Sequence, residues 1–179
     1  MSLQQTICDY LNMSLEKAQK MQLRKQRDLG LPNCMFYCDD TQQANDLICQ
    51  WAANNGINLY TITNDSKKID QTSFYLMPKL FESKLTPSEK QLKEFNKNNT
   101  VIFLKDLDEM QDLGYRRKLF DLINERQVTT VGSRTQNINL DYLLFAVATC
   151  TKNKLRSNDD FIMRTTDAKD TFRVINLDE

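Results

Sequence analysis

Short apolar runs alternate along the chain with amphipathic stretches, and this alternation predicts an α/β fold. The runs have the length of buried strands and cover residues 34–38, 57–63, 100–104, 143–149 and 172–177. Apolar residues recur at helical spacing over residues 4–29, again over 44–52 and around 115–123. Strands that alternate with helices in this way form a mostly parallel sheet, so we expect five parallel strands.

Local signals set the limits of these elements. Gly30 stands where a C-cap belongs, and Ser14 is a candidate start for a second helix after a break near residues 12–14. Thr86-Pro87-Ser88-Glu89 is a capping box, which predicts a helix to about Asn96. Alternating residues across Val128–Asn139 predict an inserted hairpin around Gly132-Ser133. We expect an N-terminal helical segment, residues 1–30, followed by an α/β domain, residues 31–179.

The composition excludes several kinds of site. The 179 residues carry 24 basic and 24 acidic side chains and no histidine. Without histidine there is no Cys/His zinc site and no Ser-His-Asp triad. The five cysteines are scattered, and Cys34 and Cys38 lie in an apolar run, which indicates small core residues. With no signal peptide and no long apolar segment, we expect a cytoplasmic protein.

The turn after the first strand stands where nucleotide-binding folds hold phosphate. In a P-loop, glycines let backbone N–H groups surround the phosphates, and a lysine reaches the outer ones. Residues 39–46 contain neither glycine nor lysine. They carry three carboxylates instead, namely Asp39, Asp40 and Asp46. These suit the dipole of the following helix, and they would repel a triphosphate.

The order of these motifs resembles the core of an AAA+ ATPase with degenerate motifs, over roughly residues 31–178. In that alignment Asn45 takes the place of the P-loop lysine and Asp46 that of its Ser/Thr. Lys105 falls on the Walker B Asp and Asp106 on the catalytic Glu. A register shifted by one residue gives Asp106 the Asp position and still leaves no catalytic Glu. The polar residue of sensor 1 corresponds to Cys150 or Thr151.

The resemblance implies a three-layer fold of the P-loop NTPase type, with the five strands in the order 5-1-4-3-2. It places Arg164 in the stretch where the family carries an arginine finger. The family's helical lid has no counterpart. A phosphate would lose its cradle without the P-loop lysine, and magnesium would meet Lys105 instead of a carboxylate. We therefore expect no catalytic residue, no metal site and no ATP or magnesium cofactor.

The acidic residues near the strand ends have two interpretations. Asp106, Asp108 and Glu109 are either metal ligands or solvated turn residues, and we favour the turn. Asp39 and Asp40 are expected to cap the following helix. We also expect the ammonium of Lys105 to pair with a carboxylate of the preceding turn.

The favoured function is that of a non-catalytic AAA+-like interaction or structural subunit, in DNA replication, remodelling or a phage or mobile-element assembly. A protein partner or self-association follows from it. One alternative is an atypical nucleotide-binding ATPase or switch with a rebuilt pocket. A second is a DNA-binding accessory factor, which would use the basic cluster of the first helix, namely Lys17, Lys20, Arg24, Lys25 and Arg27.

Overall fold

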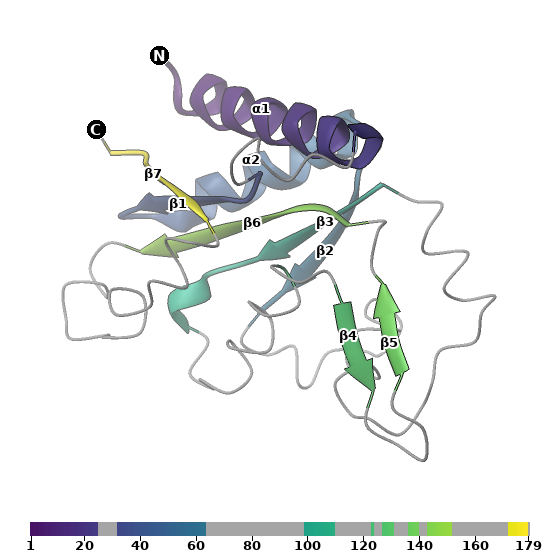
Figure 1. The fold of residues 1–179 in the computed structure, drawn as a ribbon. Coiled ribbons are helices and arrows are strands. Elements are labelled where there is room, and N and C mark those ends of the chain that lie inside the picture. Colours follow the sequence, from purple (N-terminus) through teal and green to yellow (C-terminus); the bar gives the residue numbers. More distant parts are fainter. Residues whose placement is uncertain are drawn as a thin grey trace.

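The computed structural model describes residues 1–24, 32–63, 99–109, 123, 127–130, 136–139, 143–151 and 172–178. The N-terminal part holds α1 (Leu3–Arg24), β1 (Cys34–Cys38), α2 (Thr41–Asn54) and β2 (Asn58–Ile62). After it come β3 (Thr100–Leu104), the short 3₁₀ helix η2 (Leu107–Glu109), β4 (Gln127–Thr130), β5 (Gln136–Asn139), β6 (Leu143–Thr151) and β7 (Arg173–Asn176). Figure 1 shows their arrangement.

Five of the strands form one parallel sheet in the order β2-β3-β6-β1-β7. This is the predicted order 5-1-4-3-2, read from the other edge. The central strand is β6, and eight of its nine residues are buried, as expected for a strand covered on both faces. The strands β4 and β5 pair antiparallel and separately from the sheet, which confirms the predicted hairpin.

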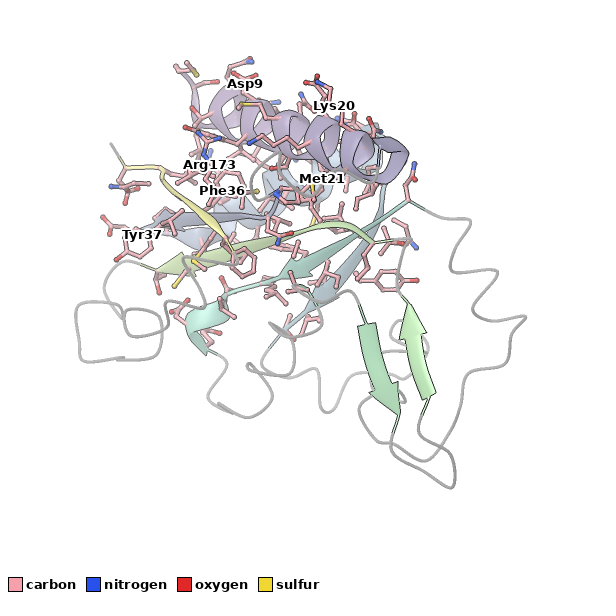
Figure 2. All side chains as sticks on the ribbon, in the orientation of Figure 1. Asp9, Lys20, Met21, Phe36, Tyr37 and Arg173 are labelled. Atoms are coloured by element: carbon pink, nitrogen blue, oxygen red, sulfur yellow. The ribbon has the colours of Figure 1, made fainter. Side chains whose placement is uncertain are left out.

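The helices α1 and α2 lie side by side over one face of the sheet (Figure 1). Phe36 points from β1 into the space below α1, where its ring meets that of Tyr10 edge-on (Figure 2). Trp51, Phe103 and Phe145 belong to the same buried cluster between the helices and the sheet. Neither helix of the described part is long and apolar enough to cross a bilayer.

The opposite face of the sheet is buried as well. Its side chains include Met35, Ile102, Leu104 and Ala148, each at most 2% exposed. The helix predicted over residues 86–96 lies outside the described residues, and of the one around residues 115–123 only the buried Ile123 is described. The described helices therefore form one layer over an α/β sheet, and the second layer stays a prediction.

The helix α1 runs without interruption from Leu3 to Arg24, so the break considered near residues 12–14 is wrong. Ser14 is only 7% exposed and lies on the side of α1 that also buries Ile7, Leu11 and Ala18. Its hydroxyl hydrogen-bonds to the thiol of Cys34 in β1. A buried serine with a partner in the sheet does not need to cap a helix. The expected C-cap at Gly30 lies outside the described residues.

Asn33 positions the strands on both sides of β1 where the sheet begins. The backbone N–H of Ala146 in β6 donates to the Asn33 side-chain oxygen at 2.8 Å. The backbone N–H of Arg173 in β7 donates to the Asn33 carbonyl at 2.9 Å. Asn33 is 6% exposed, so each bond satisfies a group that water hardly reaches. One residue thus sets the register of three adjacent strands.

Phe103→Ala is expected to lower the free energy of unfolding by about 3–5 kcal/mol, because it opens a cavity under α2 at a side chain with no exposure. Chemical denaturation measures the change. Val174→Ala is the matched control, since Val174 is 52% exposed on the edge strand and should change stability by about 0.5 kcal/mol or less. A loss below about 1 kcal/mol for Phe103→Ala would contradict the core described above.

Candidate functional site

The C-terminal ends of β1, β3 and β6 meet at the beginning of α2, which is where parallel α/β sheets bind ligands (Figure 1). Four side chains form a continuous hydrogen-bonded group there, and we call it the strand-end network. Its members are Thr41 and Asn45 of α2, Asp106 after β3, and Thr149 of β6.

Only two residues, Asp39 and Asp40, separate β1 from α2. Asp40 is the N-cap, and its carboxylate accepts from the backbone N–H of Gln42 at 2.9 Å, which confirms the predicted capping role. The backbone N–H of Asp39 donates to the carboxylate of Asp178 at 3.0 Å. Two backbone donors at the start of α2 are therefore satisfied by the chain's own carboxylates.

Asn45 occupies the middle of the strand-end network. It lies just over one turn into α2, is 2% exposed, and faces the sheet. Its side-chain oxygen accepts from the hydroxyl of Thr149 at 2.7 Å, and its amino group donates to Asp106 at 3.2 Å. An amide can donate and accept at once, so it connects a hydroxyl on β6 with a carboxylate beyond β3.

Asp106 is the anchor of the same network. Its carboxylate oxygen Oδ1 accepts from the hydroxyl of Thr41 at 2.5 Å as well as from Asn45. Its backbone N–H donates to the hydroxyl of Thr149 at 3.0 Å. Asp106 also adopts a φ of 50°, a left-handed conformation that costs most residues energy and that Asp tolerates better than others. The hydrogen bonds hold the backbone in this turn.

Asp108 makes a second link between β3 and β6. Its carboxylate accepts from the backbone N–H of Thr151 at 3.2 Å and from the hydroxyl of the same residue. Asp108 is only 6% exposed, and Asp106 is half-buried. The interpretation of Asp108 as a solvated turn residue is therefore wrong, because hydroxyl and amide donors replace water at both of its carboxylate oxygens. Asp106 lies in the turn as expected, and its Oδ1 accepts from two side chains. Glu109 is exposed, as expected.

Lys105 does not form the expected ion pair. Among the described residues, it has no salt bridge to Asp39, Asp40 or Asp46. Its backbone N–H donates to the carbonyl of Ile62 at 2.9 Å, as strand pairing with β2 requires. Its positive charge opposes the rise of the Cys49 pKa, so the side chain lies on the Cys49 side of α2. Of the carboxylates expected to pair with Lys105, Asp40 and Asp46 accept from Gln42 instead.

The pKa of the Cys38 thiol reflects the negative charge at this end of the sheet. Its pKa is raised from an ordinary value of 9.0 to about 11, first by burial and then by the neighbouring carboxylates of Asp178, Asp40, Asp39 and Asp106. The thiol donates to the backbone carbonyl of Asp40 at 3.2 Å. Cys150 on β6 is fully buried, and its thiol faces the carbonyl of Thr151 at 3.9 Å. Both cysteines are buried and act as structural residues.

Several predicted site residues lie away from the strand-end network or outside the described part. Asp46 is exposed on α2 and accepts from Gln42 at 3.0 Å. In the basic cluster, Lys20 pairs with Glu16 one turn earlier on α1, and Figure 2 shows Lys20 on the side of α1 that points away from the sheet. Arg164, Lys25 and Arg27, together with the side chain of Arg24, lie outside the described residues.

Sequence reasoning missed two contributors to this end of the sheet, Thr41 and Asp178. Thr41 was not singled out, although it is the first residue of α2 and so lies beside the strand ends. Thr149 is a polar residue in an apolar strand, with the same parity as Phe145 and Val147, which predicts that it faces α2. The sequence around Asp178 does not indicate its role, because the residue that it contacts, Asp39, lies 139 positions away.

The arrangement is that of a closed structural site. Its donors and acceptors are matched to one another, and among the described residues no group of three His, Cys, Asp or Glu side chains is placed to hold a metal ion. Two backbone N–H groups of the kind that bind anions at a helix N-terminus donate to carboxylates of the chain here. The geometry favours fixing α2 onto the sheet over binding an anion.

Asn45→Asp is expected to destabilise the fold by about 1–3 kcal/mol at neutral pH, because it removes the donor to Asp106 and buries a second carboxylate beside it. Burial raises the folded-state pKa of the new carboxyl, so the deficit is smallest at acidic pH and grows as the pH rises toward neutrality. Urea denaturation at several pH values measures it. Gln43→Glu, an exposed amide-to-acid change on α2, should show little effect at any pH.

Cys38 should make the fold sensitive to alkali. Its folded pKa of about 11 exceeds the ordinary 9.0, so its contribution is complete below pH 9 and is lost as pH rises toward 11. We expect the free energy of unfolding to decrease over this range, and less so in Cys38→Ala. Equal pH dependence of the two proteins would show that the Cys38 thiol is not responsible.

Comparison of the chain with models of known protein families and with curated proteins gives no match. The family is therefore not shown by similarity. The protein is characterised by a parallel α/β fold and by side chains at the strand ends that hydrogen-bond to one another.

Proposed function

We propose that this protein is a non-catalytic domain of the AAA+ type that acts as an interaction or structural subunit. One observation carries the proposal. The backbone N–H groups of Asp39 and Gln42, at the turn where such folds hold phosphate, already donate to the carboxylates of Asp178 and Asp40. A phosphate would have to displace both carboxylates against their charge.

The strand order supports the fold type within this proposal. An all-parallel sheet with the order β2-β3-β6-β1-β7 is what the resemblance to AAA+ cores implies. The hairpin β4–β5 precedes β6, in agreement with the branch that inserts a hairpin before sensor 1. A fold of this kind hosts many activities, so the function is argued from the site.

The state of the catalytic positions supports a non-catalytic role. Asp106, at the position of the catalytic Glu, accepts from Thr41 and Asn45 and is half-buried. A general base needs its lone pairs directed at water or substrate, and the Oδ1 atom of this carboxylate is occupied by two side chains of the chain itself. Asn45, at the position of the P-loop lysine, is buried against the sheet.

Nucleotide binding distinguishes this proposal from the alternative of a nucleotide switch with a rebuilt pocket. Titration calorimetry with Mg-ATP is expected to give no saturable heat for the unchanged protein. Saturable binding at micromolar concentration would overturn the proposal and favour the switch. A salt-dependent affinity for duplex DNA would favour the accessory-factor alternative instead.

A double variant, Asp40→Ala with Asp178→Ala, tests the physical reason. It frees both backbone donors and removes two negative charges, so any affinity for ATP should increase relative to the unchanged protein. Asp9→Ala with Glu16→Ala is the matched control, because it removes the same charge at exposed positions of α1, away from the turn. An equal increase in the control and in the test variant would show that net charge, and not the occupied turn, decides binding.

A further inference from the structure

The helix α2 ends at the one Asn-Gly pair of the sequence, Asn55-Gly56. Asn55 is the C-cap, and Gly56 follows it with a φ of 62°, a left-handed conformation that glycine adopts without strain. The backbone N–H of Gly56 donates to the carbonyl of Ala53 at 3.3 Å. The backbone N–H of Ile57 donates to the carbonyl of Ala52 at 2.9 Å. These two bonds form a Schellman motif, which explains why a glycine directly follows Asn55.

The side chain of Asn55 holds the last turn of α2 together. Its amino group donates to the carbonyl of Trp51 at 2.8 Å, and its backbone N–H donates to the same carbonyl at 3.1 Å. Trp51 is the one tryptophan of the sequence. Its indole N–H donates to Asn12 of α1 at 2.9 Å, and its ring packs on Phe145 of β6. The Asn55 amide therefore supports the residue through which the end of α2 contacts both α1 and the sheet.

An asparagine before a glycine places an electrophilic carbon next to a nitrogen that no neighbouring side chain shields. The backbone nitrogen of Gly56 can attack the side-chain carbonyl carbon of Asn55 and close a five-membered succinimide ring. The bond from that carbon to the side-chain nitrogen breaks, and the amino group leaves as ammonia with the proton that the Gly56 nitrogen gives up. Water then opens the ring at either carbonyl and yields aspartate or isoaspartate. The sum consumes a water molecule and releases ammonia, and it needs no oxidant or reductant.

The site is open to solvent, and the backbone holds it in an unreactive conformation. Asn55 and Gly56 are exposed. Apart from its chain neighbours, no atom of the described residues lies within 4 Å of the place that a Gly56 Cβ would take. Ring closure requires the Gly56 nitrogen to lie beside Cβ of Asn55, whereas at a ψ of 4° it eclipses the Asn55 backbone nitrogen instead. The reaction therefore requires the last turn of α2 to open, which is a local event and does not need global unfolding.

We propose that Asn55-Gly56 is a self-modification site, at which deamidation follows opening of the last turn of α2 and then irreversibly loosens the hold on Trp51. Both products replace the amino donor by a carboxylate, so an acceptor faces the Trp51 carbonyl. The new negative charge lies at the C-terminal end of α2, where the helix dipole disfavours it. Isoaspartate also lengthens the backbone by one carbon, which disrupts the spacing of the Schellman bonds. The modification does not involve nucleotide binding and is independent of the function proposed above.

Storage of the folded protein at a series of alkaline pH values tests the reaction. Because the Gly56 nitrogen must lose its proton, we expect a species with one more negative charge to accumulate faster as the pH rises, and peptide mass mapping to place the change at Asn55. In urea the conversion should be at least about tenfold faster, because the last turn no longer restrains the Gly56 nitrogen.

Two glutamine variants test which residue reacts. Asn55→Gln should suppress the conversion, because its longer side chain would have to close a less favourable six-membered ring. Asn54→Gln is the matched exchange at the preceding exposed position and should leave the rate unchanged.

Asn55→Asp reproduces one product and tests the structural consequence. Because Trp51 is the one tryptophan and is 3% exposed, its fluorescence reports on the end of α2. We expect its emission to shift to longer wavelength and the urea midpoint to decrease. Asn54→Asp is the control, because it adds the same charge at the same end of α2 and keeps the Asn55 donor, so it should show the smaller changes.

Three results would overturn the proposal. The first is an unmodified Asn55 in folded protein after the protein in urea has converted, and the second is an equal rate in the two states. The third is equal emission and an equal midpoint in the two aspartate variants. If Asn55→Asp fails to fold, the emission of the converted species, separated by charge from the unchanged protein, decides the third point.

Discussion

A carboxylate that leaves water must find donors, and the half-buried carboxylate of Asp106 is the constraint around which the strand ends are arranged. Thr41 and Asn45 supply those donors from α2, and this places the helix over the ends of β3 and β6. Thr149 closes the group by accepting from the Asp106 backbone and donating to Asn45. The apolar stripe of α2 fixes its face, and these bonds fix its position along the sheet.

Carboxylates of the chain, and not a bound anion, accept from the backbone donors of the short turn before α2. A phosphate-binding loop wraps its anion with backbone donors, and the donors remain unsatisfied until the ligand arrives. Here Asp39 and Asp40 suffice as a connection, and their surroundings supply carboxylates to the free N–H groups. The backbone N–H groups thereby obtain from the chain itself the hydrogen bonds that a nucleotide would otherwise provide.

The strands can be predicted from the sequence more readily than the contacts of the site. Residues 34–38 and 100–104 are continuous apolar runs between polar residues, and both strands have these bounds. The role of Asn45 is harder to predict. Helix periodicity predicts which face of α2 Asn45 lies on, but it does not predict that the side chain bonds to Thr149, 104 positions away. Ser14 shows the opposite error. Its local capping preference was outweighed by burial against Cys34, which only the tertiary structure provides.

The position of β1 has a consequence for how this protein is made. Both of its neighbours in the sheet, β6 and β7, are encoded more than a hundred residues later. During synthesis the strand therefore emerges from the ribosome with two unpaired edges and waits for most of the chain to follow. Pairings between distant segments form slowly, so both edges of β1 stay unpaired until β6 and β7 have been synthesised.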